Sequence, residues 1–266
     1  MQSGIAASLA FRRLVSPTLL LGTLTVASLG ACGGGDDSGK DNGIAAKSPR
    51  QVVSDVASSL ARVRSFHLDG TMAVDGKRTK VVADVEQPNR FHLTLKQQAS
   101  SVEMIVVGSA AFIKANAAFW EQQRSGAGSV LAGKWIKAPQ STRELRDLTR
   151  DLSTEKLSRC LLEDHGTLGD GGKASVGGQS AVVVVDKGDR PGTAPGKLYV
   201  AATGEPLPLR VLTTGRERPG GNRGDECSDP DSKSSPGDQL TFSRYNEDLD
   251  VKAPAQAIDP TGRDAS

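Results

Sequence analysis

The feature that most constrains the fold is a change of the hydrophobic period to two, beginning at Phe66 and continuing to Ala115. Apolar and polar residues alternate in five short segments, at residues 66–74, 79–86, 90–96, 101–107 and 111–115. Turn-forming residues separate these segments, as in Asp75-Gly76-Lys77 and Pro88-Asn89. Alternation of this kind is typical of strands with one buried and one solvated face, and tight turns join such strands antiparallel. The sequence therefore predicts an antiparallel meander.

A helix is predicted directly before the meander. Ser48 and Gln51 are spaced as a capping box, and Pro49 stands at the favoured first helical position. Apolar residues then recur at helical spacing over about 16 residues, at Val52, Val53, Val56, Ala57, Leu60 and Val63. We expect this stripe to pack on the sheet, because a helix lying in a membrane surface would carry Trp or Phe and many Lys.

The later chain predicts more strands, with two helices before them. Helices are expected at residues 143–152 and 153–163, and strands at residues 181–186, 197–202, 207–213 and 239–245. Phe119-Trp120 and Trp135 flank a Gly-rich loop and are interpreted as cross-strand partners. The Gly-rich residues 169–178 are expected to form a loop, and residues 249–258 an extended tail. The predicted fold class is α+β, with a single domain at residues 48–262 and a polar loop insert at residues 214–238.

The N-terminus has the pattern of an export signal. Arg12 and Arg13 precede an apolar run of about 14 residues, too short to span a bilayer, and the run leads to Leu29-Gly30-Ala31-Cys32. That motif resembles the bacterial lipobox, in which the cysteine is acylated and the leader is cut before it. We expect a signal peptide at residues 1–31, lipidated Cys32, and a flexible tether at residues 32–47, rich in Gly, Asp and Ser. The alternatives are an ordinary signal peptide or a free buried cysteine. The chain would then be held at the extracytoplasmic face of the cell membrane by its lipid anchor.

Two cysteines are left after Cys32. Because an exported protein with an even number of cysteines favours a disulfide, we expect Cys160 and Cys227 to be bonded. The alternative is a redox or metal site, for which His165 is the only nearby histidine.

The sequence favours a protein that is not an enzyme. The histidines, at positions 67, 92 and 165, are scattered, and no nucleophile elbow, zinc-protease or phosphate-loop motif is present. We therefore expect no catalytic residue, no metal and no cofactor. Removal of Arg12 and Arg13 with the leader leaves 31 basic and 31 acidic residues, interspersed along the chain. Nucleic-acid binding is not expected, because no basic stripe appears.

These features together resemble the LppX/LprG-type envelope lipoproteins, which are similar to LolA and LolB. The resemblance rests on the lipobox, the tether, the capped helix and Ser65-Phe66-His67-Leu68, and then on three later motifs. Those motifs are Gly196-Lys197-Leu198-Tyr199-Val200, Glu205-Pro206-Leu207-Pro208-Leu209-Arg210, and Phe242-Ser243-Arg244-Tyr245-Asn246 followed by Val251 and Pro254. The resemblance implies a strongly curved antiparallel sheet, a half-barrel, wrapped around a few helices with an apolar cavity between them. The insert at residues 214–238 and the expected disulfide depart from the family pattern.

The resemblance also implies a function, which is carriage of acylated lipid or glycolipid within the cell envelope, with a transporter as a possible partner. A cavity of a few hundred cubic ångströms could bury acyl chains. The candidate wall residues are Phe66, Leu68, Met72, Phe91, Leu93, Leu95, Met104 and Val106. The alternative is that these residues fill a packed core, and that the chain is a non-catalytic structural or sensor/interaction lipoprotein.

Overall fold

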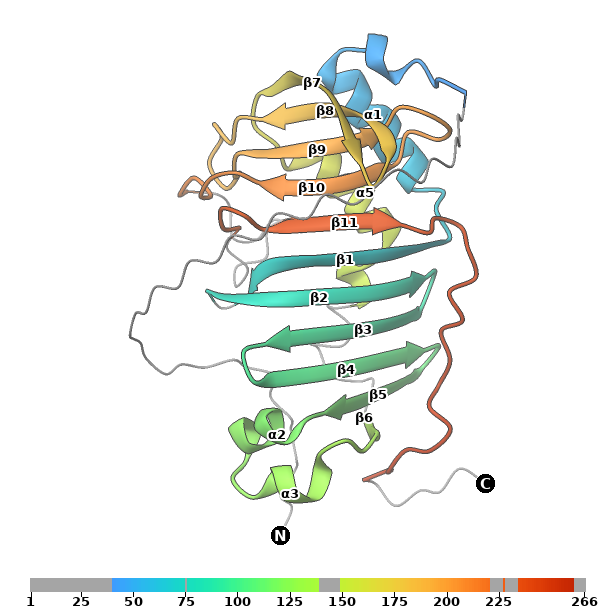
Figure 1. Ribbon diagram of the computed structural model, residues 1–266, viewed down its shortest axis with the longest axis vertical. Helices are drawn as coiled ribbons and strands as arrows, with labels where there is room; N and C mark the ends of the chain where they lie inside the picture. The colour runs from blue at the N-terminus through green and yellow to red at the C-terminus, as the bar shows by residue number, and fades with distance from the viewer. Residues whose placement is uncertain (1–39, 75, 139–148, 221–226, 228–233, 261–266) are drawn as a thin grey trace, which may run out of the picture. The chain divides into compact units, whose positions relative to one another are not determined.

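The computed structural model describes residues 40–74, 76–138, 149–220, 227 and 234–260, all within the compact unit Lys40–Ser266. Eleven strands form one antiparallel sheet in the order β6-β5-β4-β3-β2-β1-β11-β10-β9-β8-β7 (Figure 1). The first six are β1 (Ser65–Val74), β2 (Lys77–Glu86), β3 (Arg90–Gln97), β4 (Ser100–Val107), β5 (Ala110–Ala115) and β6 (Ile136–Ala138). The others are β7 (Leu168–Val176), β8 (Gln179–Asp186), β9 (Gly196–Ala201), β10 (Pro208–Thr213) and β11 (Gln239–Ser243). The predicted α+β class with an antiparallel sheet is confirmed.

The meander from β1 to β5 has the predicted segments and the predicted alternation. Each of these strands pairs antiparallel with the next, and β1 pairs on its other side with β11. The pair β1–β11 is therefore the seam that joins the meander to the strands of the second half. In that half β9 and β10 pair as expected, and four consecutive residues of β8, Ala181 to Val184, are buried.

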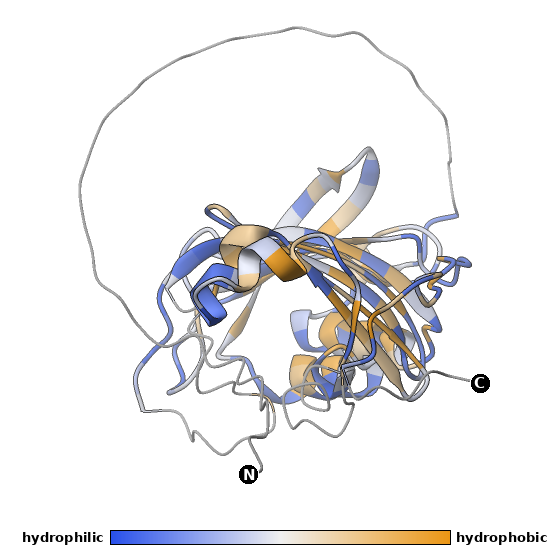
Figure 2. Cartoon of the chain, turned by 90° about the horizontal axis from the view of Figure 1, so that it is seen from below, coloured by the Kyte–Doolittle hydropathy of each residue, from blue (hydrophilic) through white to orange (hydrophobic). Residues whose placement is uncertain are grey.

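Among the described residues, helices α1 (Pro49–Leu60) and α5 (Thr154–Glu163) pack on one face of the sheet, which we call the inner face. Helix α1 has the predicted capping box, with the Ser48 side chain accepting from the Gln51 amide, but it is 12 residues long and shorter than expected. Helix α5 begins after Ser153, whose hydroxyl caps it. Val52 and Val56 of α1 pack against Val184 and Val200. Figure 2 shows the strands following an arc with helices on its inner side.

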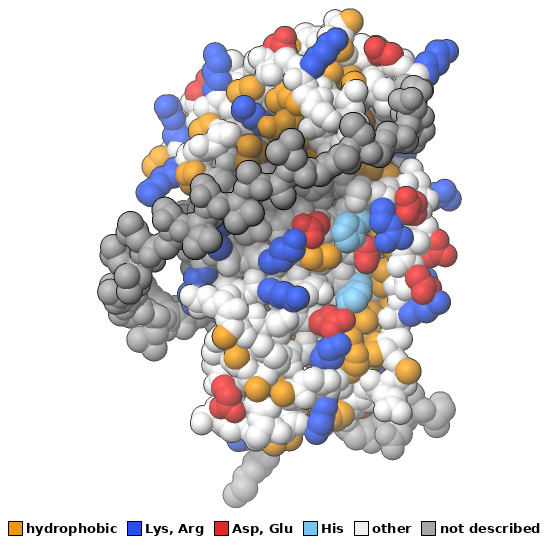
Figure 3. All heavy atoms as spheres, viewed as in Figure 1, with side chains coloured by type: hydrophobic (Ala, Val, Ile, Leu, Met, Phe, Trp, Pro, Cys, Tyr) orange, Lys and Arg blue, Asp and Glu red, His pale blue; other side chains and the backbone are white. Residues whose placement is uncertain are grey.

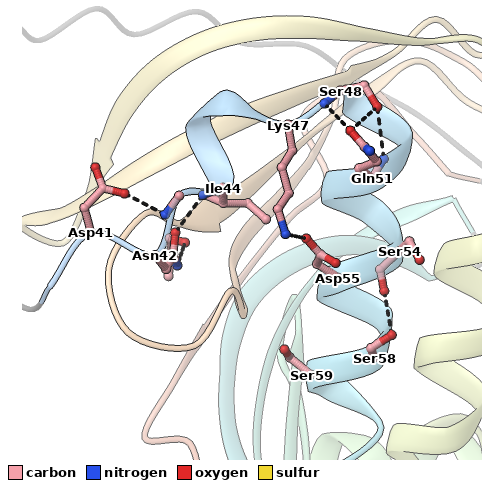
Figure 4. A network of polar contacts seen from close by, with 12 residues as sticks. Asp41, Asn42, Ile44, Lys47, Ser48, Gln51, Ser54, Asp55, Ser58 and Ser59 are labelled. Atoms are coloured by element: carbon pink, nitrogen blue, oxygen red, sulfur yellow. Dashed lines mark hydrogen bonds and ion pairs between the residues drawn. The ribbon is translucent and has the colours of Figure 1, made fainter.

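The folded chain begins earlier than the sequence indicates. The expected flexible tether is wrong for residues 40–47, because the Asn42 side chain donates to Ala201 O at 3.0 Å and to Gly204 O at 3.1 Å. Its Oδ1 accepts from the Ile44 amide, and Ile44, within the 3₁₀ turn Ile44–Ala46, is 1% exposed (Figure 4). These hydrogen bonds between the Asn42 side chain and the backbone, together with one buried aliphatic side chain, offset the entropy lost when this Gly- and Asp-rich segment is ordered.

Two expectations about local structure are wrong. Phe119 and Trp120 are not cross-strand partners, because the Asn116 side chain accepts from the Phe119 amide and caps helix α2 (Ala117–Gln123). A short helix α3 (Ala127–Leu131) follows within the expected loop. The Gly-rich residues 169–178 are mostly strand β7, whose pairing with β8 shifts between Asp170 and Lys173. A bulge of this kind is where glycine is tolerated inside a strand.

The chain after β11 crosses the outer face of the sheet. Leu249 and Val251 are buried there against Ile105 and Phe112. The Leu249 amide donates to Glu86 Oε1, Arg90 donates to Val251 O, and Ile258 forms a parallel bridge with Ile136. Figure 1 shows this tail passing along the ends of β1 to β6.

Several predictions fall outside the described residues. These are the signal peptide, Cys32, the tether at residues 32–39, the first part of the helix expected at residues 143–152, and most of the insert. Among the described helices, none is long and apolar enough to cross a bilayer.

Candidate functional site

The candidate site is the apolar inner face of the meander. All eight residues predicted as cavity walls contribute to one hydrophobic cluster, in which Met72 and Leu95 are half-buried and the other six are buried. Residues paired across neighbouring strands share a face, so the strand register sorts this surface into rows. Which of these residues contact a ligand stays a prediction.

The first row is fully packed. It runs Phe66, Val85, Phe91, Val106 and Ala111 across β1 to β5, and all five are buried; Phe66 is 0% exposed. The C-terminal end of α1 meets this row, because Leu60 belongs to the same cluster. At this end of the strands the inner face is an ordinary core.

A second row, parallel to the first, continues the apolar surface. It contains Leu68, Ala83, Leu93 and Met104, which are buried, and ends at Ile113 on β5, which is half-buried. Phe242 of β11 pairs with Leu68 and extends the row across the seam.

The third row is different, because much of it is accessible. It runs from β10 to β5 through Val211, Leu240, Gly70, Val81, Leu95, Val102 and Ala115. Leu240, Leu95 and Val102 are only half-buried, and Val211 is 37% exposed although it lies on the inner face. Exposure of the inner apolar face thus increases from the first row to the third.

Sequence reasoning named only Leu95 from this third row. It missed Val211 and Leu240, because both lie in the second half of the chain and reach the row only through the β1–β11 seam. No local sequence pattern predicts that two strands more than 160 residues apart in the chain pair with each other. The alternation in β10 and β11 would have marked these residues as inward-facing once the pairing was known.

The outer face carries a polar array, visible beside the two histidines in Figure 3. His67 Nδ1 lies 2.7 Å from Asp84 Oδ1, and His92 Nε2 lies 2.8 Å from Glu103 Oε1. Ser243 is the register partner of His67, so a serine, a histidine and an aspartate lie in line across β11, β1 and β2. Among the described contacts no hydrogen bond joins Ser243 to His67, and the array lies on an open strand surface. It lacks the donor–acceptor chain that activates a serine nucleophile.

A shallow cleft of about 410 Å³ lies further along this face, between β4–β5 and the α2–α3 segment. Its charged groups are Glu103 and Lys114, which pair at 2.5 Å. Burial by itself raises the pKa of Glu103, but hydrogen bonds and charges from Lys114 and His92 lower it, and the net pKa is below the ordinary value. A carboxylate held ionised in this way is suited to a structural ion pair and not to proton transfer near neutral pH.

The described residues contain no group of three or more His, Cys, Asp or Glu side chains placed to hold a metal ion. Cys160 of α5 and Cys227 are joined by a disulfide, as the sequence predicts. His165, the histidine considered as a partner for a metal, instead places Nδ1 2.7 Å from Gly166 O.

Comparison with solved structures identifies proteins with a similar fold. LprF from Mycobacterium bovis matches with a TM-score of 0.53 and 15% sequence identity, over 78% of this chain and 97% of that chain. The lipoprotein LppX from Mycobacterium tuberculosis matches with a TM-score of 0.48 and 15% identity, over 77% of this chain and 98% of that chain. No protein-family model and no curated protein matches the sequence. The predicted resemblance to LppX/LprG-type proteins is confirmed at the level of the fold.

Proposed function

We propose that the chain is a membrane-anchored lipoprotein, acylated on Cys32, which binds an acylated lipid or glycolipid on the inner face of its sheet. It carries that lipid within the cell envelope, at the extracytoplasmic side of the membrane. An envelope transporter is the class of partner that would supply or accept the lipid. The proposal includes no catalytic step and no cofactor.

The observation that carries the proposal is the accessibility of the third row. Apolar side chains facing the interior of a fold are normally buried, and exposure of contiguous apolar surface marks a binding site. Here Val211 and Leu240 are neighbours on β10 and β11, and Leu95 and Val102 are neighbours on β3 and β4, each with part of its surface free. Gly70 and the buried Val81 connect the two pairs in the same row. An acyl chain is apolar, flexible and long enough to lie across several strands, so it fits a floor of this kind.

Two further observations support the proposal. The fold is that of LprF, and the sequence contains the lipobox-like Leu29-Gly30-Ala31-Cys32 after an apolar leader. A protein held at a membrane surface by two or more acyl chains is placed where lipid cargo is available.

Native mass spectrometry of Lys40–Ser266, prepared without detergent, tests the proposal directly. We expect an adduct of lipid mass that organic extraction removes, and uptake of added phospholipid by the extracted protein. A clean apo mass with no uptake would refute lipid carriage. It would favour the alternative, a structural or sensor/interaction lipoprotein with a filled core.

A pair of variants locates the ligand. Leu95→Trp places a large ring on the third row and should reduce lipid uptake at least tenfold, because it occupies the floor on which an acyl chain would lie. Val130→Trp is the matched control, since Val130 of α3 is 58% exposed and outside the inner face. Equal uptake by both variants would place the lipid elsewhere.

A further inference from the structure

Two loops are tied together at one end of β8, β9 and β10. The Gly192 amide donates to Arg218 O at 2.8 Å, the Arg218 amide donates to Thr193 O at 2.9 Å, and the Thr214 amide donates to Pro195 O at 2.8 Å. These bonds hold residues 187–195 beside residues 214–220. Basic side chains from separate parts of the sequence are thereby brought to one end of the sheet.

We call this set, with the two neighbouring cations of β9 and β10, the basic rim. Its members are Lys187, Arg190, Lys197, Arg210, Arg216 and Arg218. Five of them are exposed, and Arg210 is half-buried over the Tyr199 ring. Among the five, Arg190 donates to His165 O at 3.0 Å. Figure 3 shows Lys and Arg side chains gathered beside this part of the sheet.

The cations of the rim outnumber the acids in the same loops and form no ion pair with them in the described residues. No ion pair joins any of the six cations to a carboxylate of the described residues. The acids in the same loops are Asp186, Asp189 and Glu217. Asp186 accepts from the amides of Gly166 and Gly188, and Asp189 accepts from the amide of Thr167. Two of the three carboxylates thus accept hydrogen bonds from backbone N–H groups, and of the rim cations only Lys187 has a charge interaction with one of them, Asp189, among the described contacts.

The rim lies at the same end of the strands as the accessible part of the inner face. Strand β10 ends at Thr213, and the rim loop 214–220 follows it directly. Val211, the most exposed member of the third row, is two residues before that end. A surface that contacts the rim would therefore lie next to the apolar floor.

We propose that the basic rim docks the folded unit on the surface of an anionic lipid bilayer. Exposed Lys and Arg side chains are attracted to anionic headgroups within a Debye length of the membrane, and each such contact raises the partition coefficient by a factor of about five. Docking itself rests on the rim alone. We expect docking to bring the third row close to the membrane so that lipid can enter, and this role of docking rests on the proposed function.

The test is vesicle co-sedimentation of Lys40–Ser266, which lacks the acylated cysteine and so reports only on the folded unit. We expect binding to vesicles of phosphatidylcholine mixed with phosphatidylglycerol, weak binding to phosphatidylcholine alone, and loss of binding as salt rises. Arg216→Gln with Arg218→Gln should weaken binding about 25-fold, as two factors of about five predict. The backbone bonds of Arg218 do not depend on its side chain, so the loops should keep their structure.

Arg64→Gln with Lys134→Gln is the matched control, because both residues are exposed, neither forms an ion pair with a described acid, and the change in net charge is the same. Equal loss in both double variants, or equal binding to the two kinds of vesicle, would overturn the proposal. Competition by inorganic phosphate beyond a salt-matched control would also overturn it, in favour of a small-anion site. The lipid-mass measurement is independent, so lipid carriage and membrane docking can fail separately.

Discussion

Replacing Gly70 by alanine tests whether the seam between the two halves of the sheet holds the fold together. Gly70 lies in the middle of β1 and pairs with Leu240 of β11. A Cβ at this position would stand 2.1 Å from Gln239 O and 2.8 Å from Leu240 Cα. Both are backbone atoms, so neither can rotate away as a flexible side chain would.

The size of the effect follows from this geometry. Non-bonded atoms are in optimal contact at about 3.5 Å, so β11 has to move away from β1 by about 1 Å or more. Overpacking of this kind costs about 1–3 kcal/mol, and weakening two hydrogen bonds of the seam costs about 1 kcal/mol each. We expect Gly70→Ala to lower the free energy of unfolding by about 3–5 kcal/mol, a large part of the roughly 5–15 kcal/mol typical of a folded domain.

Urea unfolding of Lys40–Ser266, followed by the fluorescence of Trp120 and Trp135, measures this loss. Gly169→Ala is the matched control, because Gly169 is also in a strand and its added Cβ would meet only Val185 O, at 3.9 Å. We expect the control to stay within about 0.5 kcal/mol of the parent chain. If Gly70→Ala were equally close to the parent, the argument that β1 and β11 approach too closely for a side chain would be refuted.

Three other predictions follow from particular contacts. Asn42→Ala removes two donated bonds and one accepted bond, so hydrogen exchange of the Ile44 amide should accelerate; unchanged exchange would mean that residues 40–47 are held by other contacts. Cys160→Ser with Cys227→Ser opens a loop of 67 residues and should lower the free energy of unfolding, measured by heat or urea, by about 4 kcal/mol. A decrease below about 1 kcal/mol would contradict the chain-entropy account of the disulfide. The pKa of Glu103 is lowered in the folded chain, so its contribution to stability is present above the unfolded pKa and is lost as pH falls through the folded pKa. Glu103→Gln should therefore reduce the loss of unfolding free energy below about pH 4.5, measured by urea unfolding at several pH values. An unchanged dependence of the unfolding free energy on pH in this acid range would refute the prediction.

The meander and its inner face were predictable because local physics decides them. Alternation assigns Phe66, Leu68, Phe91 and Leu93 to one face, and tight turns make neighbouring strands in sequence neighbours in space. The capping box at Ser48 is equally local, because all its partners lie within one helical turn. These features required no knowledge of the second half of the chain.

What could not be predicted depends on contacts between distant segments. The composition of residues 40–47 is that of a tether, but the segment is ordered because Ala201 O and Gly204 O, at the β9–β10 turn, accept hydrogen bonds from Asn42. Phe119 and Trp120 have high strand propensity, but they lie in a helix because the Asn116 side chain caps its N-terminus. The accessible third row depends on Val211 and Leu240, whose place on the inner face is set by pairing across the seam.

The dimensions of the sheet explain why an apolar floor is left accessible on its inner face. Eleven strands spaced about 4.8 Å apart extend over about 50 Å, whereas the two helices described in full on this face, each about 10 Å wide, cover about 20 Å. Helices α1 and α5 are 12 and 10 residues long, so they reach only about 18 and 15 Å along their axes. Val52 and Val56 of α1 are engaged with β8 and β9, and only its last turn reaches the meander at Leu60. Leu152 and Leu157 also pack against the meander cluster, yet Val211, Leu240 and Leu95 keep part of their surface accessible among the described residues. A lipid that lies along these three residues would remove that surface from water.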